Sequence, residues 1–197
     1  MIFLASASPR RAELLAQIGI QFEVTPAHID ETAQPGEVIE DLVQRLCREK
    51  AVAVRAKLDE MKSGDLVLAA DTLIGLDGEI IGKPESREHC AQILARLSGR
   101  EHQAYSAVAL VNHDGRVNSK VSLNRIKFRS VKAHEIRYYC QTDEPMDKAG
   151  AYAIQGLAAI FIEQLSGSYS SVMGLPLFET AELLAVAGQP ITTIKSP

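Results

Sequence analysis

Residues 2–11 read IFLASASPRR, and they predict the first strand and the first helix of the chain. The apolar run from Ile2 to Ala5 is typical of a short buried strand, and Pro9 suits the first position of a helix. Ser8 stands directly before that proline, where a hydroxyl can cap the helix by accepting a backbone N–H. The stretch therefore predicts a strand that passes directly into a capped helix.

Arg10 and Arg11 occupy the first turn of this helix, where acidic rather than basic side chains are favoured. One interpretation is a capped helix whose arginines lie in solvent. The other is an anion site, because free backbone N–H groups, small hydroxyls and two guanidinium groups together suit a phosphate. The stretch alone leaves both interpretations open.

The remaining elements follow in an order that defines the fold class. Helical periodicity predicts helices over residues 9–18, 37–58, 85–97, 133–140 and 177–187. Apolar runs predict strands over residues 22–24, 66–70, 80–81, 103–111, 116–128 and 158–165. This alternation, with a β-hairpin inserted, predicts an α/β fold with a mixed twisted sheet and flanking helices.

An acidic residue stands at the end of the apolar run 66–70. Asp71 follows the run directly, at the usual place for catalytic groups in open α/β sheets. Asp77-Gly78 predicts a tight hairpin, which we expect to return Lys83 to the side of Asp71. The two residues form either a simple ion pair or part of a metal-and-phosphate site, and the neighbouring helix start favours the second.

Two polar segments offer further candidates. Asp30 and Glu31 adjoin in a loop after the strand 22–24, where functional side chains concentrate, although loops of this kind are more often merely solvated. Residues 147–156 read DKAGAYAIQG, and such small side chains allow the backbone to approach a ligand closely. Gln155 in that segment either contacts such a ligand or is simply exposed.

Length, charge and cysteine content narrow the class of protein. At 197 residues the chain fits one domain over residues 1–197, with room for an inserted lobe. A net charge of −4 argues against a nucleic acid polymer as partner. No run approaches the ~20 apolar residues of a membrane helix, and no secretory leader is recognisable. Three scattered cysteines without disulfide or metal spacing indicate reduced thiols and a cytoplasmic protein.

Several short motifs occur in a consistent order along almost the whole chain. They are S-x-S-P-R-R at 6–11, D-E-T at 30–32, R-E-K-A at 48–51, A-D-T at 70–72, G-K-P at 82–84, D-K-A-G-A-Y-x-I-Q-G at 147–156 and G-L-P-L at 174–177. Together they resemble the Maf family, which is named for septum-formation inhibition and understood as nucleoside triphosphate pyrophosphatases. The series is far more specific than any one of its motifs.

The resemblance implies an inosine-triphosphatase-like fold of two lobes, with the nucleotide in the cleft between them, and usually a homodimer. It implies hydrolysis of a nucleoside triphosphate between the α and β phosphates, which releases the monophosphate and pyrophosphate. A divalent cation, Mg²⁺ or Mn²⁺, is expected as cofactor. Direct attack of water at the α-phosphate is the simplest route, since phosphoryl chemistry asks a protein mainly for positioning and charge stabilisation.

The family's functional positions carry over onto this chain. Asp71 matches the catalytic acid, which acts as general base or holds the metal, and Glu31 matches the acid that helps to hold it. The positions that contact phosphates match Ser8, Arg11, Lys50 and Lys83. The positions that set base preference match Arg11, Thr72 and Gln155. That combination resembles the branch acting on dTTP, UTP and modified uridine triphosphates, a role in cleaning the nucleotide pool.

Two other functions stay open at this point. One is a nucleotide-binding regulator of cell division whose hydrolysis is incidental or absent. Asp71 and Glu31 favour the enzyme, because a pure binder of polyanions has no use for two acids. The other is an inosine or xanthosine triphosphatase, which shares the chemistry but needs purine contacts that the sequence does not locate.

Overall fold

Strands and helices alternate along the computed structural model, which describes residues 1–191. The chain divides into two compact units. Unit 1 comprises Met1–Asp71, Ser106–Ser122 and the described part of residues 174–197, and unit 2 comprises Thr72–Tyr105 and Leu123–Met173. Three long strands contribute residues to both units: β3 (Leu66–Leu76), β5 (Glu101–Asn112) and β6 (Val117–Phe128).

Shorter strands complete a mixed sheet, which confirms the predicted fold class. They are β1 (Ile2–Leu4), β2 (Phe22–Val24), β4 (Glu79–Ile81) and β7 (Ile162–Ser166). Within residues 1–191 the sheet has seven strands in the order β2-β1-β3-β5-β6-β7, with β4 paired to β3 outside this path. β1 is parallel to β2 and β3, whereas β3–β4 and β6–β7 are antiparallel.

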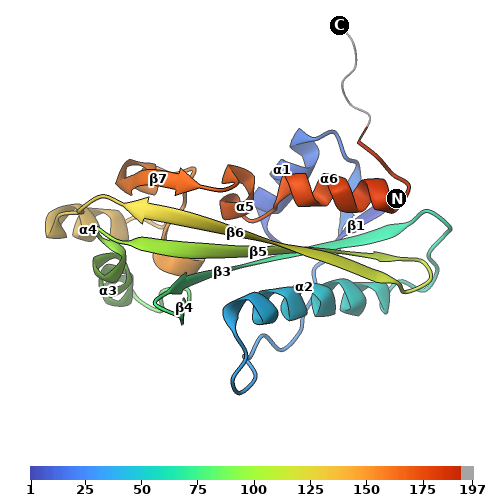
Figure 1. Cartoon of the computed structure of the whole chain (residues 1–197), viewed down its shortest axis with the longest axis horizontal. Coiled ribbons are helices and arrows are strands. Elements are labelled where there is room, and N and C mark those ends of the chain that lie inside the picture. Colours follow the sequence, from blue (N-terminus) through green and yellow to red (C-terminus); the bar gives the residue numbers. More distant parts are fainter. Residues whose placement is uncertain (192–197) are drawn as a thin grey trace, which may run out of the picture. The chain divides into compact units, whose positions relative to one another are not determined.

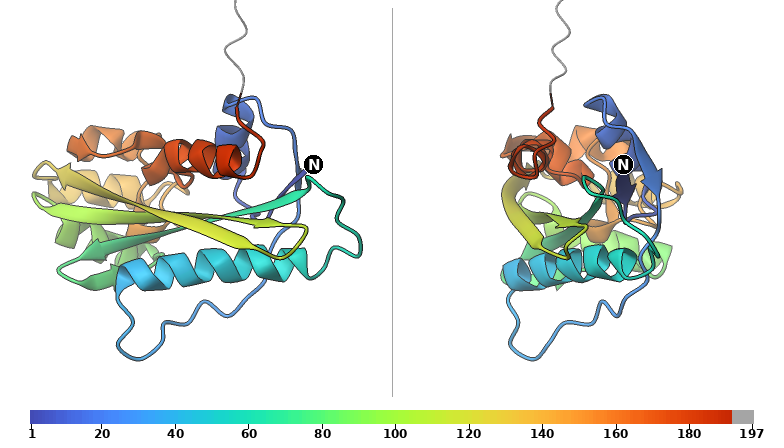
Figure 2. Two further views of the ribbon diagram at one scale, coloured as in Figure 1. Left: turned by 45° about the vertical axis from the view of Figure 1, so that its right-hand side comes forward. Right: turned by 90° about the vertical axis from the view of Figure 1, so that its right-hand side faces the viewer.

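In unit 1, helices cover both faces of the sheet strands. α2 (Ile39–Arg55) lies on one face, and α1 (Pro9–Gln17) and α6 (Leu177–Val186) lie on the other (Figure 1 and Figure 2). The buried side chains of α2 recur at intervals of three and four, as an amphipathic helix requires. They are Ile39, Leu42, Val43, Leu46, Cys47, Lys50, Ala51 and Val54. A lysine therefore belongs to the face that α2 buries.

In unit 2, two helices are joined by a covalent bond. α3 (Arg87–Leu97) packs against α4 (Ala133–Cys140), and Cys90 forms a disulfide with Cys140 across a Cα–Cα distance of 6.0 Å. The expectation of three reduced thiols was therefore wrong. The two cysteines are 50 residues apart in the chain, so only the packing of the two helices brings them together. Cys47, in unit 1, is free and buried.

The shorter elements of unit 2 follow α4. They are the 3₁₀ turns η1 (Ala149–Ala151) and η2 (Leu157–Phe161), and the helix α5 (Tyr169–Met173). The predicted strand over residues 158–165 is only partly right, because η2 takes its first half and β7 its second. None of the helices in the described part of the chain has the length and apolarity needed to cross a lipid bilayer.

Aromatic rings form the centre of the unit 2 core. His102 lies edge-to-face against Phe128 and Tyr152, with ring centroids 5.0 and 5.4 Å away. The His102 side chain is fully buried, and its Nε2 lies 2.8 Å from the Tyr152 hydroxyl. Burial lowers the pKa of His102 to about 4 because the interior disfavours an imidazolium. The ring is therefore neutral at physiological pH.

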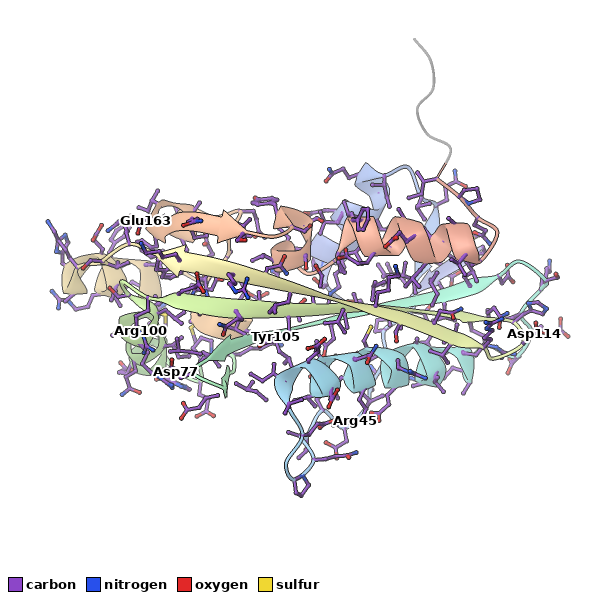
Figure 3. The ribbon with its side chains drawn as sticks, viewed as in Figure 1. Arg45, Asp77, Arg100, Tyr105, Asp114 and Glu163 are labelled. Atoms are coloured by element: carbon purple, nitrogen blue, oxygen red, sulfur yellow. A yellow bond between two sulfur atoms is a disulfide. The ribbon has the colours of Figure 1, made fainter. Side chains whose placement is uncertain are left out.

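The hairpin predicted at Asp77-Gly78 is confirmed in unit 2. It joins β3 to β4, and both turn residues have positive φ, 55° for Asp77 and 82° for Gly78, as a type I′ turn requires. Arg100 donates from Nη2 to both carboxylate oxygens of Asp77, at 2.7 and 2.6 Å; Figure 3 labels both residues. The turn is thus defined by backbone conformation and tied by an exposed ion pair.

Candidate functional site

Ser6, two residues after the end of β1, organises the start of α1 in unit 1. Its Oγ accepts hydrogen bonds from the backbone N–H of Ser8 at 3.2 Å and from Nη1 of Arg11 at 3.1 Å. Ser8 is the N-cap residue, but its hydroxyl makes no capping hydrogen bond, so that part of the prediction was wrong. Sequence reasoning missed the role of Ser6, although it is the first serine of the S-x-S motif.

Arg11 turns its guanidinium inward within unit 1. Nε donates to the carbonyl oxygen of Gly174 at 2.9 Å, and Nη2 lies 3.7 Å from Oδ1 of Asp71. The side chain is only 15% exposed, so the solvent-facing interpretation is wrong for this arginine. Burial lowers the pKa of the guanidinium, and the nearby Asp71 carboxylate acts in the opposite direction. Arginine nevertheless remains charged in proteins, so Arg11 is a fixed, oriented cation.

Lys50 links two carboxylates in the same unit. Its Nζ donates to Oδ1 of Asp71 at 2.9 Å and lies 2.7 Å from Oε1 of Glu31. Lys50 and Asp71 are buried, whereas the Glu31 side chain is 60% exposed on its loop. Arg11, Lys50, Asp71 and Glu31 therefore form one charged cluster, which we call the unit 1 cluster. Three of the four approach from different elements: α1, α2 and β3.

Asp71 lies inside β3, not after it. The strand was expected to end at Ala70, but it continues to Leu76, because a single acid interrupts the apolar pattern without interrupting the backbone pairing. β1 pairs with β3 in parallel, and the backbone N–H of Ala5 donates to the carbonyl of Leu68 at 2.7 Å. The start of α1 and the acid on β3 are thus placed by neighbouring strands.

One oxygen of Asp71 has no partner. Oδ2 is buried and accepts no hydrogen bond, whereas Oδ1 is occupied by Lys50. A buried carboxylate oxygen without a partner is costly, and it suits a ligand that arrives with positive charge or a proton. Mg²⁺ is usually bound through one or two carboxylates together with water and substrate phosphates. Asp71 and Glu31 fit that requirement; no cluster of three or more metal-binding side chains occurs among residues 1–191.

Cys47 lies beside the cluster but is not equipped as a nucleophile. Its Sγ lies 3.3 Å from the carbonyl oxygen of Ala69, and burial together with the Asp71 carboxylate raises the pKa of the thiol. Since the thiolate is the reactive form, this cysteine is inert at physiological pH.

The other three predicted site residues belong to unit 2. Thr72 is half-buried in β3, Lys83 is exposed two residues beyond β4, and Gln155 is exposed between η1 and η2. The loop that carries Lys83 is tied to η1, since the N–H of Gly150 donates to the carbonyl of Gly82 at 3.1 Å. The expected proximity of Lys83 to Asp71, and the joint action of residues from both units on one nucleotide, stay predictions.

Comparison with known proteins gives consistent matches over nearly the whole chain. A family model described as "Maf-like protein" matches residues 1–187. The dTTP/UTP pyrophosphatase of Aromatoleum aromaticum is 50% identical over 200 residues, which cover 96% of this chain and 97% of that protein. Those of Methylobacillus flagellatus and Bordetella parapertussis are 49% and 48% identical, covering 96% and 95% of this chain and 94% and 92% of theirs.

Solved structures give a more distant match. The Staphylococcus aureus Ham1 protein is 18% identical and covers 64% of this chain and 71% of its own, with a TM-score of 0.45.

Proposed function

Because the chain belongs to the Maf family, we propose that it is a nucleoside triphosphate pyrophosphatase that hydrolyses dTTP, UTP and modified uridine triphosphates to the monophosphate and pyrophosphate. Relatives named dTTP/UTP pyrophosphatase that match along almost the full length support this assignment. The observation that carries it is the unit 1 cluster, in which a buried acid with one unpartnered oxygen adjoins two cations.

The residues of the unit 1 cluster have distinct roles in this reaction. Arg11 and Lys50 offer fixed positive charge to a phosphate chain, and such groups are most effective where water is partly excluded. Ser8, whose hydroxyl is not used for capping, and Lys83 supply further phosphate contacts in the proposal. The Oδ2 of Asp71 either holds the cation or accepts the proton of the attacking water.

We propose Mg²⁺ or Mn²⁺ as the cofactor, held by Asp71 and Glu31. When bound, the cation would neutralise phosphate charge and polarise the phosphoryl oxygens. Lys50 keeps the two carboxylates together by contacting both, so their mutual repulsion does not separate them. Substitution of either acid should therefore raise the metal concentration that is needed for half-maximal activity.

Base preference is proposed to reside in Arg11, Thr72 and Gln155. The amide of Gln155 has a donor and an acceptor, which together can pair with the edge of a pyrimidine. Its exposure leaves the amide available to a ligand. We further propose that the protein is a homodimer and that it is cytoplasmic. The cytoplasmic location is proposed because nucleotide substrates are found there. The cysteines no longer support it, since two of them form a disulfide.

The test is a product analysis with a matched pair of variants. Purified protein is incubated with Mg²⁺ and a panel of nucleoside triphosphates, and the products are resolved by chromatography. We expect dTTP and UTP to yield the monophosphate and pyrophosphate. Asp71→Asn should lower kcat by at least about 100-fold. The control is Asp114→Asn, which alters an exposed residue of the turn after β5 (Asp114 is labelled in Figure 3) and should leave kcat unchanged.

Other outcomes would point elsewhere. Turnover of purine nucleotides alone would keep the chemistry and overturn the proposed roles of Arg11, Thr72 and Gln155 in base preference. Binding without turnover of any nucleotide would favour the regulator of cell division. Equal activity of Asp71→Asn and the wild type would refute the role of the unit 1 cluster.

A further inference from the structure

Glu144 in unit 2 holds the backbone that follows Gln155. Its Oε2 accepts the N–H of Leu157 at 2.9 Å, and its Oε1 accepts the N–H of Ala158 at 3.4 Å. These are the first two residues of η2, whose N–H groups have no partner within the turn itself. One carboxylate therefore fixes the chain two and three residues after Gln155.

Tyr139 holds the backbone that precedes Gln155. Its hydroxyl donates to Oε1 of Glu144 at 2.9 Å and accepts the N–H of Ala153 at 3.3 Å. The same two side chains, bonded to each other, thus anchor the segment on both sides of Gln155. The side chain of Gln155 takes no part in this anchoring and is exposed.

The residue next to Gln155 shows how closely the carboxylate approaches. A Cβ atom at Gly156 would lie 2.3 Å from the carboxylate atoms of Glu144, which is shorter than any real contact. Only glycine therefore permits Glu144 to reach the N–H groups of η2. The last glycine of the 147–156 motif is explained by this approach.

Further contacts within unit 2 support the two side chains. Tyr139 is buried on α4, next to Cys140, whose disulfide joins α4 to α3. The backbone carbonyl of Glu144 accepts a hydrogen bond from Nζ of Lys148 at 2.6 Å. Both members of the pair are thus held by further contacts within unit 2.

We propose that Tyr139 and Glu144 are positioning residues that set base preference by fixing the backbone on both sides of Gln155. The inference rests on the proposed base-reading role of Gln155. An amide distinguishes a 4-oxo from a 4-amino pyrimidine only if it is held at a defined position beside the base edge, and the backbone on both sides of Gln155 sets that position. Discrimination by hydrogen bonds is large where the groups are fixed and is lost where they can rearrange.

The experiment compares substrates within each variant. In Glu144→Gln the amide nitrogen cannot accept a hydrogen bond, so one of the backbone N–H groups held by Glu144 is released. Tyr139→Phe keeps the aromatic ring and removes only the hydroxyl that accepts the N–H of Ala153. The values of kcat and KM are measured for dTTP and dCTP. We expect the ratio of kcat/KM for dTTP over dCTP to fall by about 10-fold or more in both variants. The change should come mainly from a higher KM for dTTP, with kcat for dTTP within about threefold.

Matched controls separate positioning from general loss of structure. Tyr138→Phe alters the neighbouring, 71% exposed tyrosine of α4, and Glu163→Gln alters an exposed acid of β7 that Figure 3 labels. Neither should change the ratio. Thermal unfolding establishes that each variant is folded, and if one substitution prevents folding, the other decides.

The remaining outcomes overturn the inference at distinguishable points. If Gln155→Ala lowers the ratio but the folded Tyr139 and Glu144 variants do not, the positioning role is wrong and the proposed function stands. If kcat falls equally for every nucleotide while the ratio is unchanged, the pair is merely structural. If Gln155→Ala itself leaves the ratio unchanged, the base-reading role fails, and the inference fails with it.

Discussion

Acidification should destabilise the protein through His102. The pKa of this buried imidazole is about 4 in the folded state, against about 6.5 in an unfolded chain. Above about pH 7.5 the ring is almost entirely neutral in both states and contributes almost no pH dependence. Below pH 6.5 the unfolded chain binds a proton that the folded protein binds only near pH 4, so stability falls as the pH falls. Integrated between pH 7.5 and 5.0, this difference amounts to about 2 kcal/mol.

The assay is urea unfolding at pH 7.5 and 5.0 for the wild type and for His102→Gln. Glutamine cannot titrate but still offers a polar partner to the hydroxyl of Tyr152. The variant will be less stable than the wild type at both pH values. The quantity to compare is the decrease in the free energy of unfolding from pH 7.5 to pH 5.0. We expect the wild type to lose about 2 kcal/mol more than the variant. His134→Gln, on the exposed side of α4, is the control and should behave as the wild type. An equal decrease in unfolding free energy in the wild type and in His102→Gln would refute the role of His102 in acid destabilisation.

Three further perturbations follow from the packing. Reduction of the Cys90–Cys140 disulfide, which spans 50 residues, should lower the free energy of unfolding by about 4 kcal/mol and Tm by about 10 °C. Alkylation of three thiols in the unreduced protein would contradict the presence of this disulfide. Gly150→Ala should cost about 1–3 kcal/mol in urea unfolding, since φ is +74° and the new methyl would lie 3.0 Å from an isoleucine; Gly115→Ala, with φ +81° and open space, measures the backbone part alone. Lys50→Met should cost about 3 kcal/mol by leaving a buried acid poorly compensated, and unchanged stability would argue against that ion pair.

The fold was predictable where local patterns decide the structure. The helix over 133–140 agrees residue for residue, and the hairpin at Asp77-Gly78 follows from its turn residues. The continuation of β3 through Asp71 was not predictable, because backbone pairing with a neighbouring strand outweighs one polar side chain. The disulfide was missed for a similar reason, since it depends on how two helices pack.

The site was predictable only through the motif series. A charged residue of an amphipathic helix usually faces solvent, whereas the structure buries Lys50 against Asp71. Pairing of this kind joins residues 21 positions apart, which no local rule anticipates. Tyr139 and Glu144 lie outside the motifs altogether, and only the close approach implied by Gly156 offered a signal for them.

The hydrogen bond from Arg11 to Gly174 has a consequence for synthesis of the chain. Its two partners are 163 residues apart, and unit 1 is built from three stretches between which all of unit 2 is translated. At ribosomal speeds of roughly 5–20 residues per second, Gly174 is made about 8–30 s after Arg11. Unit 2 thus has all of its residues before the final stretch of unit 1 exists. A stalled nascent chain would hold Arg11 without its hydrogen bond to Gly174, so the orientation of this guanidinium is completed only at the end of translation.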